Sequence, residues 1–187
     1  MYKSTFKYIF TKLLGWNSDV TESIPKKCIM CIAPHTSNRD FIIGQLYAQS
    51  EGFSAGFLMK KEWFFWPLGP IFRKLGGIPV YRKKNSSLTD ILAQNAIEAE
   101  EFRLAITPEG TRSLVKTWKR GFYYIAQKAN IPIMLFAIDA QERRIICHKT
   151  FCPTGDIEKD MREIMEYYRP YITRGFRPGQ SQVEEII

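Results

Sequence analysis

The sequence predicts a single α/β domain with a largely parallel sheet and helices on both faces of that sheet. Its 187 residues are enough for one domain with a proper core but too few for two comfortable ones. Hydrophobic residues make up 45% of the chain and charged residues 25%, as in an ordinary globular protein. From Pro25 onward, short apolar runs alternate with helical patterns. This alternation is typical of parallel sheets covered by helices.

Residues 1–24 are expected to form an amphipathic helix followed by a linker. The apolar side chains that share one face at helical spacing are Tyr2, Phe6, Ile9, Phe10 and Leu13. Lys3 and Lys7 lie off that face. The apolar face could rest in a membrane interface or dock on the protein's own core, and the pattern favours neither.

Residues 25–177 are expected to form the folded domain, and residues 178–187 a flexible tail. The expected strands are 28–33, 55–59, 78–81, 104–107, 132–138 and 144–148. The expected helices are 39–50, 88–102, 122–129 and 157–168. Ligands of such sheets bind beyond the carboxyl ends of the strands, so the loops that follow the strands are where a site is expected.

The charge and the aromatic content favour an anionic membrane surface as a partner. The net charge of +8 fits nucleic acid, an anionic membrane face or a phosphorylated substrate. Aromatic residues, at 14%, are interspersed with cations, as suits a bilayer interface. No apolar run is long enough to span a bilayer, and lysines interrupt what would be the core of a signal peptide. We therefore expect a cytoplasmic protein that is peripheral to the inner face of the membrane.

The segment 60–74 has the composition of an interfacial anchor. Four adjacent aromatic residues at 63–66 are flanked by lysines and an arginine. Such rings could pack as core beneath a loop, but four adjacent large aromatics are difficult to bury together. The segment therefore favours membrane contact.

The four cysteines are predicted to be core thiols. Cys28 and Cys31 have the C-x-x-C spacing of zinc ligands, and His148 lies near Cys147 and Cys152. However, the first pair falls in an expected buried strand, where alternation would point the two thiols to opposite faces. Cysteine then acts as a small hydrophobic residue.

The strongest chemical signal is the loop after the first expected strand, which reads Pro-His-Thr-Ser-Asn-Arg-Asp at 34–40. Ser37 can cap the following helix, and Asp40 then falls in its first turn, where the helix dipole favours a carboxylate. That turn can bring Asp40 beside the His35 ring. A carboxylate there orients an imidazole and stabilises the imidazolium formed when it removes a proton. A loop histidine beside an acidic helix start, without a catalytic role, is the alternative.

Two further strand ends carry polar residues. The loop at 107–113 reads Thr-Pro-Glu-Gly-Thr-Arg-Ser, in which Gly110 permits close backbone approach and Arg112 offers a planar fork suited to phosphate. Glu109 could orient Arg112 or receive a substrate hydroxyl. A surface turn with an internal ion pair is the alternative. The strand at 77–82 ends in Arg82.

Taken in order, these segments resemble a known family. His-x-x-x-x-Asp, Gly-x-x-x-x-Arg, Pro-Glu-Gly-Thr-Arg-Ser and Ile-Pro-Ile at 131–133 are similar to the four blocks of the glycerolipid and lysophospholipid acyltransferase superfamily. The 1-acylglycerol-3-phosphate acyltransferases belong to that superfamily. Lys119 and Gly121 resemble its Phe-Lys-x-Gly continuation. The resemblance covers roughly 28–138 and implies the fold of these acyltransferases.

The resemblance implies transfer of a fatty acyl group from acyl-CoA or acyl-carrier protein to a hydroxyl of a lysophospholipid or related polar lipid. His35 would be the general base and Asp40 would orient it. The residues implied to bind the acceptor or shape its pocket are Arg82, Glu109, Gly110, Thr111, Arg112, Lys119 and Pro132. The hydroxyl would attack the thioester directly, without an acyl-enzyme, a metal or another cofactor. Backbone N–H groups near Ser37 are candidates for stabilising the oxyanion.

Two other functions compete with this interpretation. The residues at 52–56 read Gly-Phe-Ser-Ala-Gly and match the serine hydrolase pattern, with Ser54 as nucleophile. That pattern needs a strand before it and a helix after it, whereas the expected order here is the reverse. A non-catalytic module that binds anionic lipid or nucleic acid would fit the charge. However, no nucleic-acid motif is present, nucleic acid is not expected as a partner, and such a module would leave His35 and Asp40 without a role.

Overall fold

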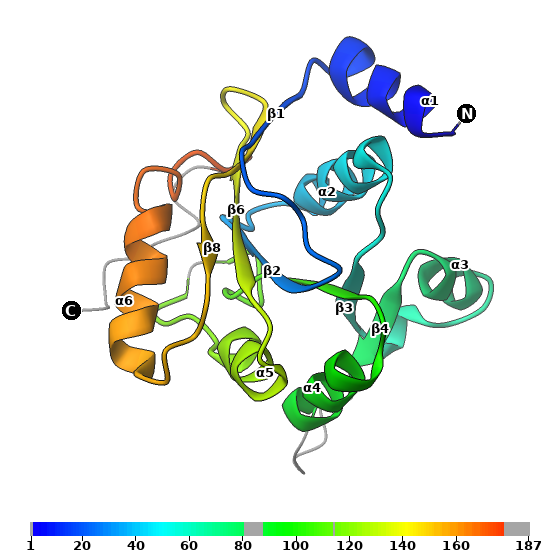
Figure 1. Cartoon of the computed structure of the whole chain (residues 1–187). Coiled ribbons are helices and arrows are strands. Elements are labelled where there is room, and N and C mark those ends of the chain that lie inside the picture. Colours follow the sequence, from blue (N-terminus) through cyan, green and yellow to red (C-terminus); the bar gives the residue numbers. More distant parts are fainter. Residues whose placement is uncertain (1, 81–87, 114, 178–187) are drawn as a thin grey trace.

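The computed structural model describes residues 2–80, 88–113 and 115–177, which form one α/β domain (Figure 1). The strands are β1 (Asn17–Val20), β2 (Lys27–Ala33), β3 (Gly56–Lys60), β4 (Gly77–Val80), β5 (Phe102–Ile106), β6 (Ile133–Asp139), β7 (Arg144–Cys147) and β8 (Thr150–Phe151). The helices are α1 (Tyr2–Tyr8), α2 (Asn38–Glu51), α3 (Leu68–Lys74), α4 (Leu88–Glu98), α5 (Gly121–Ala129) and α6 (Ile157–Tyr168). A π-helical turn, η1 (Ile9–Leu13), and a 3₁₀ turn, η2 (Lys61–Trp63), complete the described elements.

The described strands form one mostly parallel sheet, in the order β1-β7-β6-β2-β5-β3-β4, and β8 pairs with β6. The five strands from β6 to β4 are parallel to one another, whereas β7 is antiparallel to β6. Ala33 of β2 pairs with Ala137 of β6, and Cys31 pairs with Ile106 of β5. The carboxyl ends of these three neighbouring strands therefore meet at one edge of the sheet, with β2 between the other two.

Helices cover both faces of the sheet, as predicted (Figure 1). Side chains alternate along a strand, so Ile29 and Cys31 of β2 join the core formed with α4, α5 and α6. Cys28 and Met30 face the other way, into the core formed with α2 and the N-terminal segment. The central strand is buried on both sides, which explains its continuous apolar run.

The structure differs from the sequence-based expectation at several places, one of which is the unexpected strand β8. The expected linker contains β1, and the expected anchor contains α3. β1 reads Asn-Ser-Asp-Val and so lacks an apolar run. α3 contains Gly69 and Pro70, two residues of low helix propensity, so its sequence does not announce a helix. The expected helix at 88–102 ends at Glu98, because Phe102 pairs with Lys27 and already belongs to β5.

The N-terminal helix packs on the protein's own core through part of its apolar face. Phe10 is buried, with its ring centroid 6.3 Å from that of Trp16 and 6.0 Å from that of Tyr47 in α2. Tyr8 and Leu13 remain exposed. Of the two roles open for this face, docking on the core is therefore seen in the structure.

Three of the four cysteines are core thiols, and the fourth is not. Cys28 and Cys31 face opposite sides of the sheet as predicted, and burial raises the pKa of both thiols to about 12. Cys147 is also buried, but Cys152 is exposed because it follows β8, where the chain leaves the sheet. In the described ranges, no three side chains of metal-ligating type lie together.

A buried carboxylate ties α6 to α5. The carboxylate of Asp160 accepts hydrogen bonds from the Tyr123 hydroxyl at 2.8 Å and from the backbone N–H and hydroxyl of Thr154, both at 2.7 Å. Burial alone would raise the pKa of Asp160, but these hydrogen bonds to the charged form outweigh it and lower the pKa.

The lowered pKa of Asp160 predicts a stability that depends on pH. A carboxyl group with a lower pKa in the folded state stabilises the fold above its unfolded pKa, and the stabilisation is lost as pH falls through the folded value. Asp160→Asn should reduce the free energy of unfolding at neutral pH by about 1–3 kcal/mol. Urea titrations from neutral to acidic pH should show a smaller acid-induced loss in the variant than in the wild type. Parallel curves would contradict the assignment.

Candidate active site

The loop between β2 and α2 carries His35 at the carboxyl edge of the sheet. Ser37 begins the helix with an extended backbone, and its hydroxyl accepts a hydrogen bond from the Arg39 N–H at 3.2 Å. The carboxylate of Asp40 accepts one from the Ser37 N–H at 2.8 Å. Together these form a capping box, in which the helix start itself fixes the carboxylate. The predicted cap is confirmed.

This helix start brings His35 and Asp40 into contact. The Nδ1 of His35 lies 3.0 Å from the Oδ2 of Asp40. Asp40 is buried, whereas the His35 side chain keeps 19% of its surface exposed. Since Nδ1 faces the carboxylate, Nε2 is the ring nitrogen that can accept a proton from a bound molecule.

The His35–Asp40 contact is close but not an aligned hydrogen bond. Oδ2 already accepts from the N–H groups of Thr36, at 2.7 Å, and Ser37. Among the described residues, neither His35 Nδ1 nor the buried Asp40 Oδ1 has a hydrogen-bond partner of good geometry. Catalytic hydrogen bonds are often misaligned before substrate binds and tighten in the complex.

Two of the N–H groups near Ser37 that could stabilise an oxyanion are already hydrogen-bonded. The N–H groups of both Thr36 and Ser37 are already donated to Asp40 Oδ2. They serve to hold the carboxylate and are not available to a developing negative charge.

Glu109 supports His35 from the neighbouring strand. It follows β5, is buried, and its Oε2 accepts a hydrogen bond of 2.7 Å from the His35 backbone N–H. The sequence suggested that this carboxylate orients Arg112 or meets the substrate, and the structure adds a contact with the histidine loop. Such a contact joins the two loops that follow β2 and β5.

The loop after Glu109 presents exposed polar groups beside the helix start. Gly110 has a left-handed backbone with φ of 65°, and a Cβ there would lie 2.7 Å from Lys119 Nζ, so the lysine side chain lies against it. The Arg112 guanidinium donates to the side-chain oxygen of Asn38, the first residue of α2. Thr111, Arg112 and Lys119 are exposed. Arg112 therefore lies at the positive end of the α2 dipole, and Lys119 lies against Gly110 of the same loop, an arrangement suited to an anion.

One predicted site residue, Pro132, is not brought to this cluster. Pro132 precedes β6 and accepts a hydrogen bond from the Ile29 N–H, so it lies at the amino edge of the sheet, opposite His35. Arg82 lies outside the described residues. Ser54 is also at the amino edge, between α2 and β3, in the helix-then-strand order that a hydrolase nucleophile does not have.

Contacts from the C-terminal part of the domain were not predicted. The Arg177 N–H donates to the Thr36 hydroxyl at 3.2 Å, and the Tyr168 hydroxyl donates to the Cys31 carbonyl at 2.6 Å. These hydrogen bonds join residues that are 141 and 137 positions apart in the sequence. No local sequence pattern could therefore predict them.

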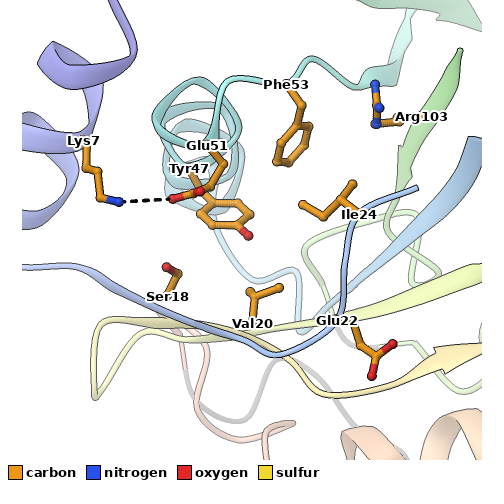
Figure 2. A pocket seen from close by; sticks show the side chains of 9 residues that line it. All are labelled: Lys7, Ser18, Val20, Glu22, Ile24, Tyr47, Glu51, Phe53 and Arg103. Atoms are coloured by element: carbon orange, nitrogen blue, oxygen red, sulfur yellow. Dashed lines mark ion pairs between the residues drawn. The ribbon is translucent and has the colours of Figure 1, made fainter. Parts of the chain in front are cut away.

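A cavity of about 530 Å³ lies at the far end of α2 (Figure 2). Tyr47, Glu51 and Phe53 line it from the end of that helix, and Lys7 pairs with Glu51 across 4.0 Å. Because α2 rises about 1.5 Å per residue, roughly 20 Å separate its two ends. The cavity is therefore separate from the His35 cluster.

A family model and a solved structure match this chain. A family model described as Acyltransferase matches residues 17–139, a range that includes the loops at 34–40 and 107–113. The fold is similar to the crystal structure of the 1-acyl-sn-glycerophosphate (LPA) acyltransferase, PlsC, from Thermotoga maritima. The TM-score is 0.64 at 18% identity, over 91% of this chain and 76% of that chain. No curated protein matches the sequence significantly. With the family model matching well over half of its length, the chain belongs to the Acyltransferase family and is an acyltransferase.

Proposed function

We propose that this acyltransferase moves a fatty acyl group from acyl-CoA or acyl-carrier protein to a hydroxyl of a lysophospholipid, with 1-acylglycerol-3-phosphate as the first candidate. The observation that supports the proposal best is the 3.0 Å contact between His35 Nδ1 and Asp40 Oδ2 at the carboxyl edge of the sheet. The similar fold of an acyltransferase described as acting on 1-acyl-sn-glycerophosphate supports this acceptor.

In the proposed reaction, His35 Nε2 takes the proton of the acceptor hydroxyl as its oxygen attacks the thioester carbonyl carbon. Asp40 stabilises the imidazolium that forms. The tetrahedral intermediate collapses, the C–S bond breaks, and the imidazolium returns the proton to the leaving sulfur. An ester and a free thiol result, and the base is regenerated.

The phosphate of the acceptor is assigned to Arg112 and Lys119. Both cations are exposed, Arg112 donates to Asn38 at the start of α2, and Lys119 lies against Gly110 of the same loop. A guanidinium binds phosphate through two parallel N–H groups, whereas an ammonium acts as a point charge. The helix dipole adds to the attraction.

Arg112→Lys should therefore raise the KM for 1-acylglycerol-3-phosphate by about tenfold, the loss expected for one charge-assisted hydrogen bond, with kcat changed much less. Steady-state kinetics against the acceptor at saturating donor measure this. Arg120→Lys is the matched control, because Arg120 is an arginine of the same domain that pairs with Glu158 on α6. Unchanged kinetics in Arg112→Lys would remove this residue from the acceptor site.

We also propose that the protein meets the membrane through an aromatic surface on η2 and α3. This aromatic surface consists of Trp63, Phe65, Trp66, Ile71 and Leu75, all exposed, with Trp66 at 84%. The cations around it are Lys60, Lys61, Arg73 and Lys74. Rings and cations in this combination suit the interface of an anionic bilayer. In the described part of the chain, no helix has the length and apolar character to cross a bilayer.

The aromatic surface begins where β3 ends, at the same edge of the sheet that carries His35. An acceptor lipid could then pass from the bilayer to the base along that edge.

Replacing Trp63 and Trp66 together by alanine should weaken binding to vesicles of phosphatidylcholine and phosphatidylglycerol by at least about tenfold, since each exposed indole contributes apolar burial in the interface. Co-sedimentation over a lipid titration measures the effect. Tyr124→Ala is the control, because Tyr124 is an exposed aromatic residue on α5. Equal binding of the double variant and the control would contradict this surface.

The reaction itself is tested with purified protein, lysophosphatidate and other lysolipids, and either acyl-CoA or acyl-carrier protein as donor. Product formation from one of these pairs, retained in Ser54→Ala, supports the proposal. No transfer across the whole panel would contradict it, and so would a trapped acyl-enzyme that depends on Ser54.

A further inference from the structure

A short segment after α6 lies over the histidine loop. This segment, Arg174 to Arg177, is called the C-terminal strap below. The Ala140 N–H donates to the Arg174 carbonyl at 2.8 Å, and the Arg174 guanidinium donates to Asp139 Oδ2 at 2.8 Å. Asp139 is fully buried at the carboxyl end of β6. The strap is therefore anchored to the strand beside β2, at the edge where the histidine loop begins.

The strap touches both neighbours of His35. A Cβ placed on Gly175 would lie 2.7 Å from Thr36 Oγ1 and 3.2 Å from Pro34 Cγ, so the glycine backbone packs directly on these side chains. The Arg177 N–H donates to Thr36 Oγ1 at 3.2 Å. Thr36 is 1% exposed beneath this contact. The loop is thus held from outside at the residues before and after the histidine.

Thr36 also connects the strap to the carboxylate. Its backbone N–H donates to Asp40 Oδ2 at 2.7 Å, while its hydroxyl accepts from the strap. A second contact covers the start of α2, where the Arg39 guanidinium lies 5.7 Å from the ring centre of Phe176. The strap therefore constrains Thr36 and the first turn of α2, the two parts of the chain that set where Asp40 lies relative to the imidazole.

We propose that the C-terminal strap is a positioning element for the His35–Asp40 pair. The Arg174–Asp139 ion pair anchors the strap, and Gly175 makes its contact with Thr36. The inference rests on the proposed role of His35 as general base. No strap residue acts on the reacting atoms. By pressing on Thr36, the strap keeps the imidazole and the carboxylate in contact, and displacements of about 1 Å in such a pair can cost about 10²-fold in rate.

Gly175→Ala tests the proposal directly. The backbone angles of Gly175 lie outside the left-handed region, so alanine suits the local backbone and the clash falls on Thr36. The variant should lower kcat by about 10- to 100-fold and leave the KM for the acceptor within about twofold. Adding Thr36→Ala removes both Thr36 atoms that the new methyl would meet, so the double variant should recover part of the lost kcat.

Two further variants complete the test. Gly44→Ala is the control, because Gly44 lies in α2 with no atom within 4 Å of an added Cβ, and kcat should not change. Thr36→Val replaces the hydroxyl that accepts from the Arg177 N–H with a methyl group, and should lower kcat severalfold at constant KM even if Gly175→Ala folds poorly.

Wild-type kcat in Thr36→Val and in folded Gly175→Ala would overturn the strap proposal. Loss of activity in Gly175→Ala that follows the folded fraction alone, with no recovery in the double variant, would overturn it too. Either result would leave the proposed function standing as long as His35→Ala is inactive. Full activity of His35→Ala would instead refute the proposed function itself.

Discussion

His35→Ala is expected to lower kcat for acyl transfer by about 10³- to 10⁴-fold, because the variant lacks the group that removes the proton from the acceptor hydroxyl. The fold should survive, since the structural hydrogen bond of this residue to Glu109 comes from its backbone N–H and not from the ring. Initial rates with lysophosphatidate and the preferred donor, together with the melting temperature, measure both effects.

The chain provides a matched control for this substitution. His148 is the second of two histidines, and its Nε2 lies 2.9 Å from Asp19 Oδ1, so it forms another histidine–aspartate pair. That pair lies between the ends of β7 and β1, and both side chains are exposed. His148→Ala should keep the wild-type kcat. Equal rates for the two alanine variants would remove the special role of His35.

Asp40→Asn is expected to lower kcat by about 10³-fold, close to the effect of removing the base. An amide can still accept hydrogen bonds from the Thr36 and Ser37 N–H groups, so the helix start is kept. It cannot stabilise an imidazolium, and it favours a different orientation of the ring. The measurement is kcat at saturating donor and acceptor.

Ser37→Ala separates catalysis from capping. This variant removes the hydroxyl that accepts the Arg39 N–H but keeps the Asp40 carboxylate. It should cost about 1 kcal/mol of stability and leave kcat within about twofold. If Ser37→Ala lost as much activity as Asp40→Asn, the carboxylate would matter for the helix start and not for the base.

Local patterns in the sequence were enough to predict most strands of the sheet and the contact between His35 and Asp40. Continuous apolar runs predicted the buried strands, and these are β2, β3, β4, β5, β6 and β7 in the structure. The capping signal at Ser37 predicted where Asp40 falls, because a helix start places its third residue within reach of the loop before it. The contact with His35 follows from that local geometry.

Features set by distant contacts were not predictable in the same way. Edge strands such as β1 and β8 are short and are defined by the strands they join, so they leave no apolar run in the sequence. The sequence suggested that Glu109 orients Arg112 or receives a substrate hydroxyl, but it did not predict the hydrogen bond from the His35 backbone N–H, 74 positions away. No local sequence pattern points to Gly175, because its proposed role depends on the contact that a side chain there would make with Thr36 and Pro34.

The pH dependence of kcat/KM in the wild type and in Asp40→Asn tests the paired roles of His35 and Asp40 most directly. The wild-type rate should fall tenfold per pH unit on the acid side, since protonated imidazole cannot accept a proton. In Asp40→Asn the rate should lie about 10³-fold below the wild-type rate, because the charge that stabilises the imidazolium is gone. A wild-type rate that is flat into the acid range, or an Asp40→Asn rate equal to that of the wild type, would contradict the account.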